Sequence, residues 1–314
     1  MKSLTAFFEG TRHVYLREIE LRDPQPNEIQ ARTLYNGICM AEVWKYTGVY
    51  HNEPILPGHE GIGIVAKVGS DVAGVKEGDL VTTTTWGEYV NIPVGRFLPI
   101  HPNPNYELKT HLVEPVSCVV TAADELNIYP GDSVILFGAG YMGLLLVQLL
   151  SRYPLARLVV ADIKKQNLEL AGLYGATELI DSSTAEGRAR LEELENEPFE
   201  IAFECAGVQS CFSSCERLLG KGGKLGVYAW HHGQRTFDGH LWHTKGLSLL
   251  NVNHWMVCKK EYLNPWIGAD RLMSQGKIEQ SRLITHEYDF TDIERAMEES
   301  TARSGNFIKS VLRF

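Results

Sequence analysis

The sequence predicts an α/β protein in which a mostly β unit is followed by a doubly wound parallel sheet. Short β-like runs separated by turn signals fill about the first hundred residues. From Ser133 onward, short apolar strands alternate with helical stretches, starting with "SVILFGAG" and "YMGLLLVQLLSRY". Strands that are apolar on both sides indicate a parallel sheet with helices on both faces.

The elements of the first unit are expected to be mostly antiparallel, because turn signals such as "PQPNE" and "KEGD" lie between them. Strands are predicted at Gln30–Leu34, Gly61–Val68, Leu80–Thr85 and Glu88–Ile92. The later region continues with "RLVVADI", "FEIAFECAG" and "GKLGVYAW", and the first two are followed by helical stretches. A helix, "TDIERAMEESTA", and a strand, "FIKSVLRF", are expected at the C-terminus.

The composition favours a small-molecule role. The chain has 314 residues, of which 44% are hydrophobic, enough for a buried core and two domains. A net charge of -9 and a pI near 5.7 disfavour nucleic-acid and anionic-membrane partners. We also expect a cytoplasmic protein, because no long apolar run or signal peptide is evident. Six scattered cysteines without a C-x-x-C pair indicate neither a disulfide framework nor a zinc ribbon.

A glycine-rich turn follows the first apolar strand of the later region. In "VILFGAGYMG", Gly138, Gly140 and Gly143 have the G-x-G-x-x-G spacing and lie between a strand and a helix. The first glycine allows a tight turn, the second lets the backbone approach a pyrophosphate, and the third lets helix and strand pack closely. The motif predicts a Rossmann dinucleotide site.

The next strand, "RLVVAD", ends in Asp162, nineteen positions beyond Gly143. A carboxylate there binds the adenosine ribose hydroxyls and repels a ribose 2'-phosphate, so NAD is favoured over NADP. Lys164 and Lys165 weaken this preference unless they belong to a solvated first helical turn.

Metal-binding residue types occur in the part of the chain outside the Rossmann pattern. A catalytic zinc takes about three ligands from Cys, His, Asp or Glu and keeps one position open. Cys39, His59, Glu60 and Glu114 could supply them. Each also has a structural interpretation: a buried thiol, a capped turn, or a carboxylate at a helix N-terminus.

Several motifs together resemble the medium-chain dehydrogenase/reductase superfamily, most closely its zinc-dependent polyol or sorbitol dehydrogenase branch. These are "NGICMAEVWKYTG", "PILPGHEGIGIVAKVGSDVAGVKEGDLV", "VEPVSCVV", "GAGYMGLLL" and "FECAG", and the resemblance extends to the C-terminus. It implies a GroES-like catalytic domain at residues 1–121, completed by residues 283–314. The Rossmann NAD-binding domain would then occupy residues 122–282.

The resemblance also implies roles for individual residues. Cys39 and His59 match zinc ligands, Glu60 matches an acid that ligates zinc or exchanges with water, and Glu114 matches a third ligand or an outer carboxylate. The expected cofactor-binding residues are Gly138, Gly140, Tyr141, Met142, Gly143, Asp162, Cys205 and Ala206. Relatives suggest a homodimer or homotetramer.

Two departures from the family pattern affect the predicted chemistry. "GDLVTTTTWGEYVNIPV" leaves no room for the four-cysteine lobe that binds a structural zinc, so one catalytic zinc per chain is expected. Ala41 and Trp44 replace members of the usual proton relay. We therefore consider Glu42, Glu60, Tyr46 and His51 as alternative proton carriers, and Trp44 as an aromatic face for substrate.

A histidine-rich stretch, "YAWHHGQRTFDGHLWHTKGLSLLNVNHW", follows the last of these apolar strands. His231 and His232 are candidates for contact with substrate or nicotinamide. The alternative is a solvated loop with ordinary core tryptophans.

The sequence thus predicts a zinc-dependent, NAD-linked dehydrogenase that oxidises a secondary alcohol of a polyol, sugar or cyclitol-like substrate. Cys39, His59, Glu60 and Glu42 are its candidate catalytic residues. The alternatives are a zinc-free quinone or enoyl-type reductase, and a non-catalytic dinucleotide-binding protein.

Overall fold

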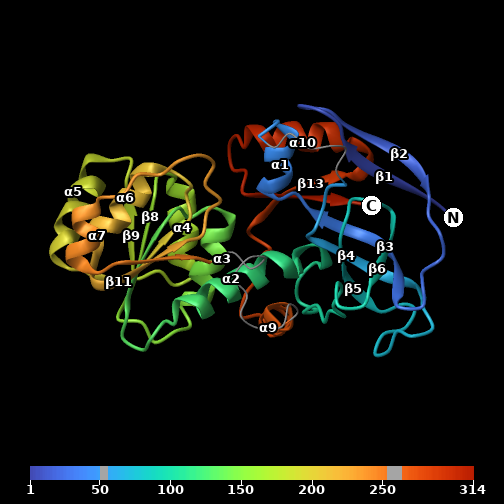
Figure 1. Ribbon diagram of the computed structural model, residues 1–314, viewed down its shortest axis with the longest axis horizontal. Helices are drawn as coiled ribbons and strands as arrows, with labels where there is room; N and C mark the ends of the chain where they lie inside the picture. Colours follow the sequence, from blue (N-terminus) through green and yellow to red (C-terminus); the bar gives the residue numbers. More distant parts are fainter. Residues whose placement is uncertain (50–55, 253–263) are drawn as a thin grey trace. The chain divides into compact units, whose positions relative to one another are not determined.

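The computed structural model describes residues 1–49, 56–252 and 264–314, and its contacts divide the chain into two compact units. The first unit comprises Met1–Val116 and Tyr262–Phe314, and the second comprises Ser117–Glu261. Figure 1 shows both units and labels many of their helices and strands. His51 and the last three residues of the histidine-rich stretch, 253–255, lie outside the described residues.

The first unit is built mainly from antiparallel strands. Strand β1 pairs with β2, and a second sheet has the order β13-β14-β3-β4-β5, with β6 also paired to β3. Only the β13-β14 pair is parallel among these. The strands are β1 (Lys2–Phe8), β2 (Val14–Glu20), β3 (Glu28–Gly37), β4 (Gly61–Val68), β5 (Leu80–Thr83), β6 (Tyr89–Pro93), β13 (Ile284–Asp289) and β14 (Lys309–Arg313).

Helices and apolar clusters complete this unit. Its helices are α1 (Met40–Tyr46), α9 (Asn264–Ser274), α10 (Ile293–Ala302) and the short η1 (Leu108–Thr110) and η3 (Phe290–Asp292). One core cluster forms where inward-facing residues of β3 and β4, such as Ile29 and Val65, meet. Another joins α1 to α10 through residues such as Val43 and Met297. The ends of β3 and β4 are therefore held on a rigid support.

The second unit contains a six-stranded sheet of order β12-β11-β10-β7-β8-β9, in which every pairing is parallel. The sheet confirms the predicted doubly wound architecture (Figure 1). Its strands are β7 (Ser133–Phe137), β8 (Arg157–Asp162), β9 (Glu178–Asp181), β10 (Phe199–Glu204), β11 (Leu219–Val227) and β12 (Ser248–Asn251). Its helices are α3 (Tyr141–Leu150), α4 (Lys165–Leu173), α5 (Ala185–Glu193), η2 (Leu194–Asn196), α6 (Gln209–Leu218) and α7 (Gly239–Lys245).

The strand order reverses next to β7. Strands β8 and β9 continue on one side of it, and β10, β11 and β12 continue on the other. In open parallel sheets a dinucleotide binds across such a switch point, beyond the carboxyl ends of the strands. The glycine-rich turn lies at this point, directly after β7.

The domain limits differ from those expected. Helix α2 (Val113–Leu126) contains the first junction, after Val116. Residues 264–282, assigned above to the Rossmann domain, group with the first unit. Asp270 accepts hydrogen bonds from His111 Nε2 at 2.8 Å and His101 Nδ1 at 2.9 Å, which ties α9 to that unit. These partners are more than 150 residues apart, so no local pattern reveals them.

Two further differences are local. Strand β5 ends at Thr83, before the expected Thr85, because Thr85 has a left-handed backbone with φ of 58°. Within the histidine-rich stretch, α7 forms where no helix was expected, capped by the Asp238 carboxylate and ended by Gly246 at φ 61°. None of the described helices is long and apolar enough to cross a membrane.

Candidate functional site

Cys39 and His59 meet because two paired strands end side by side. Cys39 follows β3 and caps the N-terminus of α1, and His59 lies two residues before β4. Strands β3 and β4 are antiparallel, with Asn36 opposite Gly61. The segment that follows β3 and the segment that precedes β4 therefore lie next to each other. The Cys39 and His59 side chains bring their ligand atoms within 4.8 Å of each other. Burial and the Glu60 carboxylate raise the pKa of the Cys39 thiol.

The side chains near His59 form two overlapping groups of metal-binding type. Ligand atoms of Cys39, Glu42 and His59 lie within 4.8 Å of one another, and so do those of His59, Glu60 and Glu114. Glu114 lies in the first turn of α2, as its place before a proline predicted, and is 5% exposed. One thiol, one imidazole and buried carboxylates are the donor set that zinc prefers.

Glu42 is buried, 1% exposed, and its side chain accepts hydrogen bonds from the segments that carry Cys39 and His59. Its Oε1 accepts from His59 Nδ1 at 2.9 Å and from the Gly58 amide at 3.4 Å. Its Oε2 accepts from the Cys39 amide at 3.2 Å. Burial opposes ionisation of Glu42, but His59 and the other donors hold its pKa below the ordinary value. The geometry is that of a carboxylate that orients an imidazole.

His59 has correspondingly strong basic character. Burial alone would lower its pKa, but Glu42 and Cys39 raise the pKa well above the ordinary value. The donated Nδ1–H leaves Nε2 as the nitrogen able to bind a metal.

Glu60 is paired with a cation, Lys309, that was not predicted from the sequence. Lys309 of β14 places Nζ 2.5 Å from Glu60 Oε2, and both residues are at most 5% exposed. A Cβ atom at Gly37 would lie 2.0 Å from the same oxygen, so this glycine makes room for the carboxylate. A lysine inside the apolar strand "FIKSVL" was the available signal, because a buried ammonium needs a partner.

Tyr46, proposed as a proton carrier, and Trp44, proposed as an aromatic face for substrate, both lie on α1. Tyr46 donates its hydroxyl hydrogen to Glu298 Oε1 at 2.7 Å and so links α1 to α10. Burial and Glu298 raise the pKa of Tyr46 to about 12. Trp44, on the same helix, is partly buried.

Tyr46 should make the folded protein less stable at alkaline pH. Its pKa is higher in the folded chain than the ordinary 10, so the unfolded chain loses this proton first. The free energy of unfolding should therefore fall as pH rises from about 10 to about 12, and Tyr46→Phe should remove this component. Urea unfolding at several alkaline pH values measures it. An unchanged pH slope in Tyr46→Phe would contradict this role.

The glycine-rich turn in the second unit has the expected geometry. Gly138 has φ of 97°, and a Cβ atom there would lie 2.8 Å from the Ala206 amide nitrogen. A Cβ atom at Gly143 would lie 2.1 Å from the Gly138 carbonyl oxygen, so close strand–helix packing requires glycine. Gly140 faces open space, which leaves room for an approaching phosphate group.

The remaining predicted nucleotide residues surround this turn. Asp162, at the end of β8, accepts from the Ala139 amide at 2.6 Å and the Lys164 amide at 2.7 Å. Tyr141 and Met142 begin α3. Cys205 lies in the turn after β10 with Ala206, and burial raises the pKa of its thiol well above the ordinary value. The Cys205 side chain is therefore a neutral, apolar surface.

The histidines proposed to contact substrate are engaged within the second unit. Both ring nitrogens of His231 are bonded, to Glu204 Oε2 at 2.5 Å and to Arg235 Nε at 2.6 Å. His232 stacks on Trp230 with ring centroids 5.7 Å apart. Both polar atoms of His231 therefore already have protein partners, and contact of His231 or His232 with substrate or nicotinamide stays a prediction.

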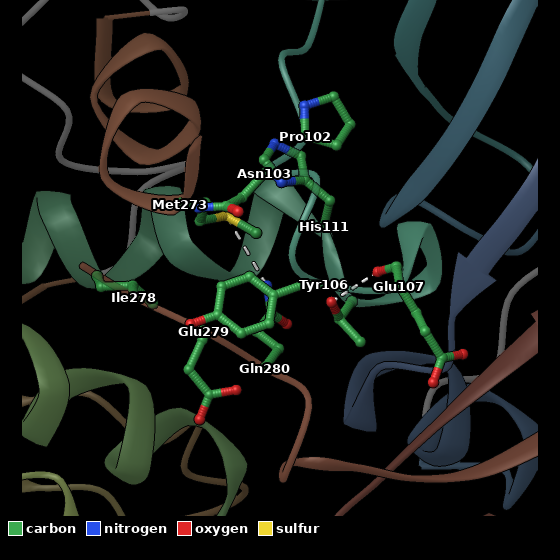
Figure 2. Close-up of a pocket in the computed structure, with 10 residues that line it drawn as sticks. Pro102, Asn103, Tyr106, Glu107, His111, Met273, Ile278, Glu279 and Gln280 are labelled. Carbon is green, nitrogen blue, oxygen red and sulfur yellow. Dashed lines mark hydrogen bonds between the residues drawn. The ribbon is translucent and has the colours of Figure 1, made fainter. Parts of the chain in front are cut away.

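A small cavity in the first unit is not a substrate site. Tyr106, His111, Met273 and Gln280 are among its lining residues, and its volume is about 10 Å³, room for one water molecule (Figure 2). Gln280 donates to the Leu112 carbonyl at 2.8 Å, and His111 is held by Asp270. The polar groups here hold α9 in place.

Comparisons with known proteins agree with this arrangement. A model of the alcohol dehydrogenase GroES-like domain matches residues 25–100, and a model of the zinc-binding dehydrogenase domain matches residues 142–264. A zinc-type alcohol dehydrogenase-like protein of Escherichia coli is 26% identical, covering 100% of this chain and 99% of the relative. D-xylulose reductase of Saccharomyces cerevisiae is 25% identical, covering 91% and 90%.

The structure of L-idonate 5-dehydrogenase from Escherichia coli superposes with a TM-score of 0.87 at 19% identity, covering 100% of this chain and 99% of that one. At this identity the likeness shows the fold. Taken with the two family models and the relatives, it confirms the predicted family. These findings together support a zinc-type, polyol dehydrogenase-like protein of the medium-chain dehydrogenase/reductase superfamily.

Proposed function

We propose that the protein is a zinc-dependent, NAD-linked dehydrogenase that acts on a secondary alcohol of a polyol or sugar. The observation that carries this proposal is that His59 belongs to two groups of donors, one with Cys39 and Glu42 and the other with Glu60 and Glu114. Glu42 is also hydrogen-bonded to His59. A zinc-free reductase on this fold would need none of these donors.

The donor set fits a zinc ion. The Cys39 thiolate and His59 Nε2 would be two ligands, and Glu60 or Glu114 would supply carboxylate oxygen. A bound zinc would act as a Lewis acid and lower the pKa of a coordinated alcohol, and NAD would accept the hydride. Glu42 fixes the tautomer and orientation of His59, and Lys309 holds Glu60 to one side.

Asp162 supports NAD rather than NADP. Its carboxylate ends β8 beside the glycine-rich turn, where it would bind ribose hydroxyls and repel a 2'-phosphate. Lys164 and Lys165 are exposed at the start of α4, in agreement with a solvated helical turn.

We expect Asp162→Asn to weaken the preference for NADH over NADPH. The ratio of the NADPH to the NADH dissociation constant should fall about tenfold, a difference of ~1.4 kcal/mol in binding free energy. The charge that repels the 2'-phosphate would be lost while an acceptor for ribose hydroxyls remains. Fluorescence titration with both nucleotides measures the ratio. Asp181→Asn, at the end of the neighbouring β9, is the matched control and should leave it unchanged.

The polyol class is supported by the relatives, among them a D-xylulose reductase. The test is NADH formation by the zinc-loaded protein with a panel of polyols, sugar acids and simple secondary alcohols. Turnover of polyols supports the proposal. Tight NADH binding without turnover of any alcohol would favour the non-catalytic alternative, for which Ala41 in place of the usual relay residue is the specific observation.

A further inference from the structure

A chain of three polar side chains joins the end of β10 to the segment after β11. Glu204 is fully buried, and its Oε2 accepts a hydrogen bond from His231 Nε2 at 2.5 Å. On the other side of the ring, Nδ1 accepts from Arg235 Nε at 2.6 Å. The His231 ring also meets the edge of Phe212, with centroids 6.3 Å apart. The imidazole is therefore fixed in both position and tilt.

The two hydrogen-bond partners of His231 determine which of its ring nitrogens carries the hydrogen. A guanidinium only donates, so Nδ1 must carry a lone pair, and the carboxylate only accepts, so Nε2 must carry the hydrogen. The ring is then neutral and lies between one negative and one positive group. Glu204 and Arg235 compensate each other's charge through the imidazole, which makes their burial tolerable.

The same three residues hold the turn 205–207 from both sides. Glu204 Oε1 accepts from the amides of Ala206 at 3.0 Å and Gly207 at 2.8 Å. Arg235 Nη2 donates to the Gly207 carbonyl at 2.9 Å. Removing His231 would take away the residue that links Arg235 to Glu204. Arg235 would then hold the Gly207 carbonyl less firmly.

The turn 205–207 lies next to the first glycine of the dinucleotide motif. Its Ala206 packs against Gly138, the first glycine of the dinucleotide motif. Asp162 ends β8 on one side of β7, and the turn follows β10 on the other side. A dinucleotide that places its adenosine ribose at Asp162 and its pyrophosphate at the glycine-rich turn must extend its nicotinamide half toward the turn 205–207.

We propose that His231 and Arg235 are positioning residues for the nicotinamide half of the bound dinucleotide. They act through the turn 205–207, which they hold against Gly138, rather than by contact with substrate. This inference rests on the NAD-binding function proposed above and assigns to "HHGQR" a task that the family motifs do not include.

The test compares two ligands that share the adenosine half. Dissociation constants for NADH and AMP are measured by calorimetry on the full chain, for wild type, His231→Ala and His231→Gln. His231→Ala should weaken NADH binding about tenfold and leave AMP binding nearly unchanged. Glutamine has one donor and one acceptor, so His231→Gln should restore much of the NADH affinity. His243→Ala, an exposed histidine of α7, is the matched control.

The outcomes separate the inference from the function on which it rests. Unchanged NADH binding in His231→Ala, or equal weakening of NADH and AMP, overturns the positioning role while nucleotide binding stands. A wild-type chain that binds neither ligand overturns both. Selective loss of NADH affinity with recovery in His231→Gln supports the assignment, because a general loss of folding would weaken AMP equally.

Discussion

Replacing Lys309 with methionine is expected to lower the free energy of unfolding by about 3–5 kcal/mol in metal-free protein. Lys309 Nζ lies 2.5 Å from Glu60 Oε2, and both side chains are almost fully buried. Without the ammonium group, the Glu60 carboxylate would remain as a buried charge with no cation beside it. The loss should be smaller in zinc-loaded protein, because the metal would partly replace the missing positive charge.

Urea unfolding followed by tryptophan fluorescence measures this effect. Two further variants test whether the loss comes from the buried Glu60–Lys309 pair. Adding Glu60→Gln to Lys309→Met removes the uncompensated charge and should recover part of the stability. Lys76→Met breaks an exposed pair with Asp79, where the lysine side chain is 83% exposed, and should cost under about 1 kcal/mol. Equal effects of Lys309→Met and Lys76→Met would contradict the role of the buried pair.

Glu42→Ala is expected to weaken zinc affinity about 10–100-fold. The variant removes the acceptor of His59 Nδ1 and two backbone contacts, so the imidazole loses its fixed orientation. Competition with a chromogenic chelator measures the affinity. Glu42→Gln keeps an acceptor for His59 and should lose less.

The same experiment distinguishes the two roles considered for Glu42. Unchanged zinc affinity together with a large loss of turnover would show that Glu42 carries protons, as the sequence allowed. Weaker zinc binding that excess zinc overcomes, with turnover restored, would show that it orients His59. The contacts of Glu42 favour the second result.

The features predicted correctly from sequence depend on local patterns. The glycine spacing from Gly138 to Gly143, placed between a strand and a helix, indicates the dinucleotide-binding turn, and apolar strands followed by helices indicate a doubly wound sheet. Residue type alone was enough to nominate Cys39 and His59, and pairing of β3 with β4 brings them together.

What the sequence did not reveal depends on contacts between distant segments. Lys309 reaches Glu60 because β14 pairs with β3, where Val311 lies opposite Gly37. His231 looked available for substrate, but its partner Glu204 lies 27 residues earlier, at the end of another strand. Periodicity and spacing give no information on such partners, since these follow from sheet order and register.

The central claim is that Cys39, His59, Glu60 and Glu114 hold one catalytic zinc. Elemental analysis of purified, desalted wild-type protein and His59→Ala tests it most directly. We predict about one zinc per wild-type chain and almost none in the variant, because His59 belongs to both donor groups and its loss leaves each group with two donors. Metal-free wild-type protein, prepared without chelators and after incubation with zinc, would contradict the claim.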